Sequence, residues 1–240
     1  MLQDQDKVIV IVGATGGIGA TLTRQLAPTG VRLVLAARNA ENLAALATEL
    51  PGSPGNVLII PTDITQPQQV DTLIQRTISQ FGQIDVLVNA AGAGILKSYN
   101  TIEPADLEKM LNLNLKGCFY TTQAAAKEMQ KRKSGHICNV VGILGKHSMP
   151  MAAAYSASKF GVVGFSKSIA EELKRFGVKI TLFYFGGIDS PFWDQVNLKV
   201  DRNKMLSCET AANAIFYALS VEPQAIPMEI NIQPESHLFF

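Results

Sequence analysis

Tyr155 and Lys159 stand four residues apart in the run YSASK. Side chains at this spacing share one face of a helix. A lysine ammonium beside a tyrosine hydroxyl favours the phenolate, which lowers the pKa of the tyrosine and makes it a usable proton donor near neutral pH. The pair is equally compatible with an ordinary helix surface, so the rest of the chain must decide between the two interpretations.

A glycine-rich loop directly follows an apolar run at residues 8–12, which read VIVIV. Glycines in such a loop let the backbone turn tightly and approach a pyrophosphate, whose charge is stabilised at the N-terminus of the next helix. The spacing GxxxGxG after a strand therefore predicts a dinucleotide site, and a merely tight turn is the alternative. The loop residues expected to contact a cofactor are Gly13, Thr15, Gly16, Gly17, Ile18 and Gly19.

The second apolar run ends in the sequence AARN, at Ala36 to Asn39. An acidic side chain at this strand end would bind the ribose hydroxyls of NAD, and none is present. Arg38 can instead pair with a 2′-phosphate, which favours NADP(H) over NAD(H). The alternative is that Arg38 is a surface residue at the start of a helix.

Two further strand ends carry polar or small residues. Asp63, followed by Ile64, can accept a hydrogen bond from the adenine amino group; its structural interpretation is an N-cap for the next helix, and both can hold. A run of small residues after the fourth strand lets a cofactor lie close to the backbone, and an ordinary turn is the alternative. This run consists of Asn89, Ala90, Ala91 and Gly92.

Short β-branched runs alternate with longer amphipathic segments along the whole chain. This alternation predicts right-handed crossovers and a doubly wound parallel sheet covered on both faces, in a single α/β domain over residues 1–240. We expect strands at 8–12, 31–36, 57–60, 84–88, 136–141, 178–183 and 228–232, and helices at 18–26, 40–50, 66–81, 104–131 with a break near Asn114, 152–176 and 209–219.

The composition excludes several classes of protein. Hydrophobic residues make up 47% and charged residues 17% of the 240 residues, with a formal net charge of +1, which indicates a well-buried globular chain and no nucleic-acid partner. No stretch is apolar and long enough to span a bilayer, and the polar first residues do not resemble a secretory signal. Three widely spaced cysteines and no histidine cluster indicate reduced thiols in the cytoplasm and no metal site.

With these motifs in place, the chain resembles the short-chain dehydrogenase/reductase family over nearly its whole length. The glycine loop, the NAAG run and the YxxxK pair follow in the family's order and spacing. The resemblance implies a Rossmann-like three-layer sandwich of seven parallel strands that binds a nicotinamide cofactor. It implies that Tyr155 exchanges a proton with the substrate oxygen and that Lys159 holds the nicotinamide ribose and lowers the Tyr155 pKa. Asn114 would bend its helix and hold a water that links Lys159 to solvent.

The chain departs from the family pattern at Gly142, which stands thirteen residues before Tyr155, where the family usually places a serine. That serine hydrogen-bonds the substrate oxygen, and losing such a donor costs on the order of 3 kcal/mol. His147 and Ser148 lie in the next loop; either replaces the donor, or both are plain loop residues. A second departure is Phe185, where a proline is common.

The segment at about 187–208 is expected to cover the substrate. By resemblance, Gly186, Gly187, Ile188 and Ser190 contact the cofactor. Side chains of this segment and of nearby loops offer an apolar wall that suits a hydrophobic carbonyl or alcohol, although they can simply pack the segment onto the body. The expected substrate-site residues are Gly142, His147, Met149, Phe192 and Trp193, with Leu96, Val196, Leu198 and Met205 around them.

Two functions follow from these residues. The first is an NADP(H)-dependent oxidoreductase acting on a carbonyl or alcohol, with Tyr155, Lys159 and Asn114 as its catalytic residues. The second is an NADP(H)-binding sensor or interaction partner that has lost efficient chemistry, which Gly142 favours. The resemblance also suggests a homodimer or homotetramer formed through the helices near 104–131 and 152–176.

Overall fold

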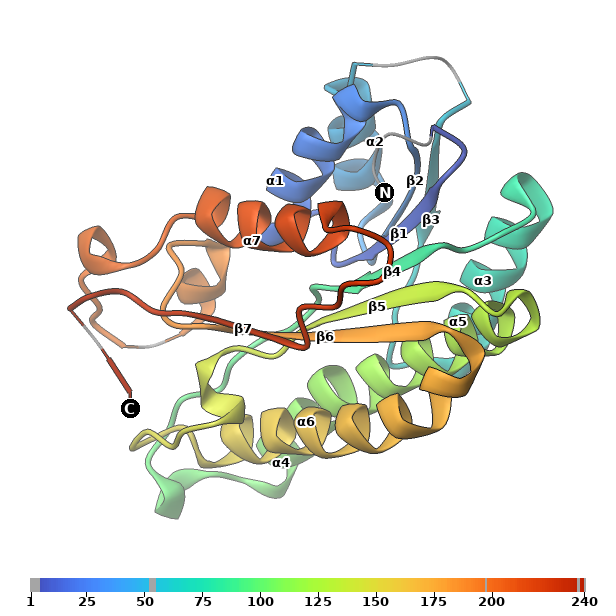
Figure 1. The fold of residues 1–240 in the computed structure, drawn as a ribbon. Helices are drawn as coiled ribbons and strands as arrows, with labels where there is room; N and C mark the ends of the chain where they lie inside the picture. Colours follow the sequence, from blue (N-terminus) through green and yellow to red (C-terminus); the bar gives the residue numbers. More distant parts are fainter. Residues whose placement is uncertain (1–4, 52–54, 197, 237, 240) are drawn as a thin grey trace.

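The computed structural model describes residues 5–51, 55–196, 198–236 and 238–239. Its centre is one parallel sheet of seven strands in the order β3-β2-β1-β4-β5-β6-β7 (Figure 1). The strands are β1 Val8–Val12, β2 Arg32–Ala37, β3 Val57–Pro61, β4 Val86–Asn89, β5 Gly135–Val140, β6 Val178–Phe185 and β7 Glu229–Ile232. The predicted doubly wound α/β fold is confirmed, and each expected strand is present with its ends shifted by at most two residues.

Helices cover both faces of the sheet (Figure 1). One face packs against α1, α2 and α7, and the other against α3, α5 and α6, with α4 beside α6. The helices are α1 Gly17–Leu26, α2 Ala40–Thr48, α3 Pro67–Phe81, α4 Pro104–Met110, α5 Cys118–Arg132, α6 Ala153–Leu173 and α7 Cys208–Ser220. None of the helices in the described part of the chain is both long enough and apolar enough to cross a membrane.

The helix expected over residues 104–131 is broken where the sequence predicted a break. A π-helical segment, Leu111–Gly117, lies between α4 and α5 and contains Asn114. Such wide turns inside α-helices frequently mark functional sites because they displace backbone groups from the regular ladder.

The sheet is apolar on both faces, which explains its continuous hydrophobic strands. In β1, Ile9 and Ile11 join the core under α1 and α7, whereas Val8 and Val10 join the core under α3 and α5. All four side chains are fully buried. A strand buried on both faces loses the polar alternation of a half-exposed strand, so a run such as VIVIV fits an interior position.

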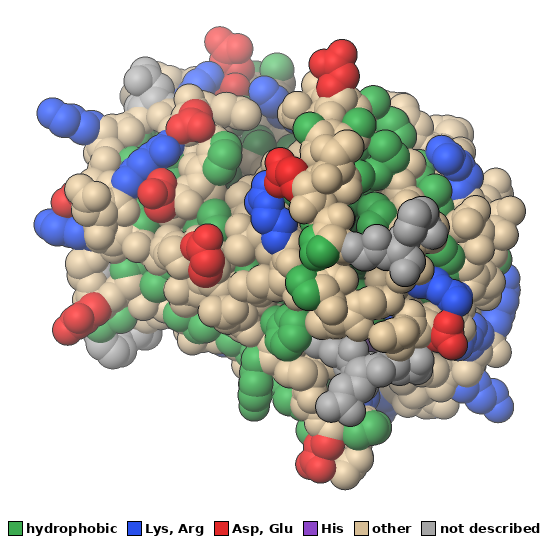
Figure 2. Space-filling view, turned by 90° about the horizontal axis from the view of Figure 1, so that it is seen from above, with side chains coloured by type: hydrophobic (Ala, Val, Ile, Leu, Met, Phe, Trp, Pro, Cys, Tyr) green, Lys and Arg blue, Asp and Glu red, His purple; other side chains and the backbone are tan. Residues whose placement is uncertain are grey.

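Most charged side chains lie at the surface, and they do not gather by sign. Figure 2 shows Lys and Arg interspersed with Asp and Glu over the face seen from above. This arrangement matches the formal net charge of +1.

One buried titratable group lies at the opposite end of the sheet from the carboxyl ends of the strands. His136, early in β5, is 2% exposed, and its Nε2 lies 2.8 Å from Oγ1 of Thr181. Its Nδ1 has no hydrogen-bond partner among the described residues. Burial, assisted by the charge of Lys179, lowers the pKa of His136 from 6.5 to about 4, so the ring is neutral in the folded protein at neutral pH.

We predict that His136 destabilises the fold as the pH falls. Because the pKa of His136 in the folded state lies below its unfolded value, the unfolded chain binds the proton first as the pH falls. The free energy of unfolding is therefore unaffected above pH 6.5 and declines as the pH falls towards about 4. Over that range the His136→Gln variant should gain about 3 kcal/mol relative to the parent in free energy of unfolding. Urea unfolding across pH measures this difference, and a difference that does not change with pH would contradict a neutral buried ring.

Candidate active site

The glycine loop joins β1 to α1 at the carboxyl edge of the sheet. Gly13 has φ +81°, and a Cβ there would lie 2.6 Å from the backbone nitrogen of Ala91. Only glycine therefore fits, because both the left-handed backbone and the close approach of the NAAG run exclude a side chain. The first glycine of the predicted motif thus brings the two loops together at the place expected for a dinucleotide.

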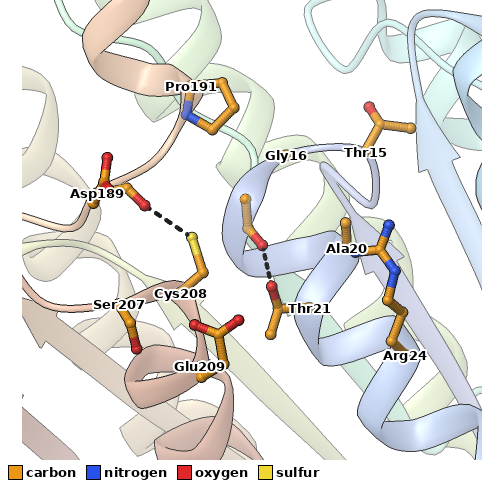
Figure 3. A pocket seen from close by; sticks show the side chains of 11 residues that line it. Thr15, Gly16, Ala20, Thr21, Arg24, Asp189, Pro191, Ser207, Cys208 and Glu209 are labelled. Atoms are coloured by element: carbon orange, nitrogen blue, oxygen red, sulfur yellow. Dashed lines mark hydrogen bonds between the residues drawn. The ribbon is translucent and has the colours of Figure 1, made fainter.

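A cavity of about 410 Å³ opens beside this loop (Figure 3). Thr15, Gly16 and Gly17 line one side of it, and the start of α7 lines the other. The Sγ of Cys208 lies 2.7 Å from the position of a Cβ on Gly17, so the N-terminus of α7 contacts the glycine loop. The first turns of α1 and α7 both border the cavity, and helix N-termini favour negative charge.

Arg38 lies at the carboxyl end of β2 and is exposed, with no ion-pair partner among the described residues. Its guanidinium is therefore free to bind an anion. The next residue, Asn39, caps α2 by accepting a hydrogen bond at 2.8 Å from the backbone nitrogen of Asn42. The cap holds the strand end in place beneath Arg38.

Asp63 does not cap α3, so the interpretation of this residue as an N-cap is wrong. Its Oδ1 accepts hydrogen bonds from the backbone nitrogen of Thr65 at 2.9 Å and from the Thr65 hydroxyl at 2.8 Å. This local turn competes with capping, and α3 starts later, with Gln66 as N-cap and Pro67 in its first turn. Ile64 is buried and packs in the core, where its side chain lies against Gly117.

The side chain of Asn89 belongs to a buried hydrogen-bond network. Its Nδ2 donates to Oγ1 of Thr122 at 3.0 Å and to Oδ1 of Asn139 at 2.9 Å, and its Oδ1 accepts from Thr121 at 2.7 Å. Asn139 in turn donates to Ser166 at 2.9 Å. These bonds use the donors and the acceptor of the Asn89 amide, so its side chain fixes β4 to β5 and α5, and Asn139 extends the network to α6.

Tyr155 and Lys159 lie on the first turns of α6, facing the end of β5. The Nζ of Lys159 donates to the carbonyl of Val140 at 3.2 Å and lies 5.7 Å from the Tyr155 ring centre. Burial lowers the pKa of Lys159 to about 8 and raises the pKa of Tyr155 above its usual value. The direction for Tyr155 is opposite to the one expected from a neighbouring ammonium, because its cause is burial, which disfavours the charged phenolate.

Asn114 connects the π segment to the loop after β4. Its Nδ2 donates to the carbonyl of Ala93 at 2.9 Å, and its Oδ1 accepts from the Ala93 backbone nitrogen at 3.1 Å. A Cβ on Gly92 would lie 3.1 Å from this Oδ1 and 3.5 Å from Nζ of Lys159. Gly92, Asn114 and Lys159 therefore lie close together.

Gly142 lies directly beside the tyrosine hydroxyl. A Cβ at this position would be 3.7 Å from Oη of Tyr155 and 3.8 Å from the carbonyl oxygen of Phe185. The backbone of Gly142 has φ +87° and ψ 162°, a region essentially reserved for glycine. Space for a side chain exists here, but an L-residue would strain the backbone.

The predicted loop residues after Gly142 have different surroundings. The ring of His147 stacks on Phe239, with centres 5.5 Å apart and planes at 25°, whereas Ser148 is exposed. Met149 packs against the core cluster on the α6 face. Neither His147 nor Ser148 has a hydrogen bond to Tyr155 in the described part of the chain.

The segment after β6 reaches across the carboxyl edge of the sheet. Its base is closed by two hydrogen bonds, from Asp189 to the Leu206 carbonyl at 2.8 Å and from Leu206 to the Gly187 carbonyl at 2.9 Å. At one point it touches the glycine loop, where Cβ of Ser190 lies 2.9 Å from the Cβ position of Gly17.

Further along, the ring of Phe192 covers Tyr155, with ring centres 5.8 Å apart, and Cζ of Phe192 lies 2.3 Å from the Cβ position of Gly94. Trp193 packs edge-on against Phe192 and donates through Nε1 to the Ile188 carbonyl at 2.8 Å. Phe192 and Trp193 are residues that the sequence suggested for the substrate site, whereas Gly94 was missed, since its only signal was its place two residues after the NAAG run.

Comparisons with known proteins agree with this geometry. A family model described as short chain dehydrogenase matches residues 7–201. An uncharacterized oxidoreductase of Staphylococcus aureus (strain USA300) is 34% identical over 229 residues, which cover 95% of this chain and 97% of that protein.

Solved structures share the fold. An alcohol dehydrogenase from the archaeon Thermococcus sibiricus, complexed with 5-hydroxy-NADP, has a TM-score of 0.88 at 22% identity, covering 98% of this chain and 99% of that one. A metagenomic short-chain oxidoreductase in complex with NADP has a TM-score of 0.79 at 28% identity, covering 95% and 97%.

We predict that Gly94→Ala destabilises the protein through Phe192. The new methyl group would overlap the Phe192 ring, and overpacking of this kind costs about 1–3 kcal/mol. The double variant Gly94→Ala, Phe192→Ala should lose no more stability than Phe192→Ala alone. Gly164→Ala is the matched control, because nothing lies within 4 Å of its Cβ position on α6. Urea unfolding tests the cycle, and additive losses would show that the two residues do not touch.

Proposed function

The chain belongs to the short-chain dehydrogenase family, and from this premise we propose that it is an NADP(H)-dependent oxidoreductase that interconverts an apolar carbonyl compound and its alcohol. The observation that carries the proposal is the pairing of Tyr155 with a buried Lys159 at the carboxyl edge of the sheet. No carboxylate of the described residues pairs with Lys159, and a buried lysine without such a partner is costly. Binding a ligand's hydroxyl groups would account for keeping it there.

The loops at this edge fit a dinucleotide. The glycine loop excludes side chains at Gly13, and it leads into the N-terminus of α1, which would stabilise a pyrophosphate. Lys159 would hold the nicotinamide ribose, and Gly187, Ile188 and Ser190 would lie along the other side. When bound, the nicotinamide supplies or accepts the hydride.

The preference for NADP(H) rests on Arg38. Its guanidinium is exposed and unpaired in the described structure, and it is the group at this strand end suited to a 2′-phosphate. The solved relative at 28% identity is a complex with NADP, which supports the same assignment.

Tyr155 is the acid in this proposal. Because burial raises the pKa of Tyr155, the hydroxyl keeps its proton at neutral pH and can donate it to a carbonyl oxygen that gains negative charge. Burial lowers the pKa of Lys159 to about 8, so Lys159 remains mostly protonated at neutral pH and stabilises the phenolate left on Tyr155. A protonated Tyr155 beside a charged Lys159 favours reduction of the carbonyl as the working direction.

Gly142 marks where this chain differs from the usual family site. We assign it to the position of the family serine, because a Cβ there would lie 3.7 Å from the Tyr155 hydroxyl. The missing donor favours a second candidate function, an NADP(H)-binding sensor with impaired chemistry. Tyr155, Lys159 and Asn114 together still favour the enzyme, since a sensor needs Lys159 for binding but not the whole set.

We predict that the protein binds NADPH and reduces apolar aldehydes or ketones. Replacing the acid by Tyr155→Phe should lower turnover by at least about a hundredfold while NADPH affinity stays unchanged. NADPH fluorescence titration and the loss of nicotinamide absorbance measure the two effects. Tight binding without turnover of any carbonyl would establish the sensor, and full activity of Tyr155→Phe would remove Tyr155 from the chemistry.

We also predict that a hydroxyl at position 142 raises the turnover rate, when it is compared with a variant that carries the same backbone strain. Gly142→Ser and Gly142→Ala should both lose about 1–3 kcal/mol of stability, because both force an L-residue into the glycine-only region. The serine variant should then turn over about a hundredfold faster than the alanine variant, since only serine supplies a donor to the oxyanion. Equal rates in the two variants would show that the missing hydroxyl does not limit catalysis.

A further inference from the structure

Residues after β7 return to the candidate site and touch three of the loops that form it. We call Gln233, Pro234, Ser236 and Phe239 the clamp. None of them carried a motif that pointed to function. Their contacts place them against the loop after β6, the loop that carries His147 and the segment after β6 that covers the site.

The first contact is with the loop that follows β6. Gly186 donates to the carbonyl of Ile232 at 2.9 Å, and Cδ of Pro234 lies 2.4 Å from the Cβ position of Gly186. The neighbouring carbonyl, that of Phe185, lies 3.8 Å from the Cβ position of Gly142. Pro234 therefore contacts the residue that follows Phe185 in the chain, and the Phe185 carbonyl lies near the Tyr155 hydroxyl.

The second contact fixes Phe239 in place. The Gln233 amide brackets the Phe239 backbone, donating through Nε2 to its carbonyl at 3.0 Å and accepting its N–H through Oε1 at 2.8 Å. This pair of bonds sets the Phe239 ring against His147 in a stacked arrangement, with centres 5.5 Å apart. The ring is half-buried and packs on the same cluster as Met149 and Tyr155.

The third contact reaches the segment that covers the site. The hydroxyl of Ser236 donates to the carbonyl of Lys204 at 3.2 Å. Lys204 lies just before Met205, whose side chain packs beside Gly187. The clamp thus joins the covering segment to the loop that carries His147.

We propose that Phe239 is a specificity-determining residue, held by Gln233 against His147 as the outer wall of the substrate site, where it limits the length of the apolar group on the carbonyl substrate. This inference rests on the proposed oxidoreductase function. Gln233 is a positioning residue, since it acts only through the Phe239 backbone. An aromatic wall suits an apolar chain because it offers a large hydrophobic face without an unpaired polar atom.

The first test compares straight-chain aldehydes from butanal to decanal with NADPH as reductant. Removing the ring in Phe239→Ala should raise the ratio of kcat/KM for decanal to kcat/KM for hexanal by about tenfold. This size is expected when a pocket gains room for the additional methylene groups of the longer substrate. Phe239→Tyr should keep the parent's ratio, and NADPH affinity should stay unchanged in both variants. A ratio in Phe239→Ala equal to that of the parent would overturn the proposal.

A second test does not depend on activity. In Gln233→Ala, backbone amides of residues 143–149 and 202–206 should exchange with deuterium about tenfold faster, because the two bonds that hold Phe239 are lost. Gln224→Ala is the matched control, since the exposed Gln224 side chain precedes β7 and, among the described residues, bonds only Glu222, at 3.0 Å.

The two tests separate the two hypotheses. If the parent reduces neither aldehydes nor ketones but Gln233→Ala loosens both loops, the proposed function is wrong and the clamp stands as a structural fact without a substrate. Unchanged exchange in Gln233→Ala would overturn the clamp whatever the activity.

Discussion

The hydrogen bond between Asn89 and Asn139 is the constraint on which the site depends. It joins β4 to β5 at 2.9 Å where both strands end. Partners from α5 and α6 satisfy the remaining polar atoms, so the network adds no unpaired buried group. Since Gly92 follows β4 and Lys159 lies on α6, one buried network fixes the distance between the two sides of the proposed cofactor site.

The π segment at Asn114 completes this arrangement by a different means. Asn114 lies in this segment, and its side-chain amide binds both backbone groups of Ala93. Ser158, one residue before Lys159, accepts from the same amide at 3.2 Å. Three elements that diverge elsewhere are therefore held together at the point where chemistry is expected.

The sequence was sufficient for the fold because its signals are local. Alternating apolar runs located each strand, and the motifs placed Gly13, Asn114, Tyr155 and Lys159 at one edge of the sheet. Features that depend on tertiary contact were missed: the turn that Asp63 makes with Thr65, the raised pKa of Tyr155, and the stacking of Phe239 on His147. Residues 147 and 239 lie far apart in sequence, so no periodicity could connect them.

The shifted pKa values of Tyr155 and Lys159 link cofactor binding to acid–base chemistry. Burial alone disfavours the charged form of both groups, so it leaves the tyrosine protonated and weakens the lysine cation. Lys159 has three donors and uses one on Val140. Acceptors such as ribose hydroxyls would stabilise the Lys159 cation and raise the pKa of Lys159. A lysine that stays charged in turn lowers the pKa of the neighbouring Tyr155 hydroxyl. A site without a serine at Gly142 then depends on this coupling more strongly, because Tyr155 alone must meet the charge that develops on the substrate oxygen.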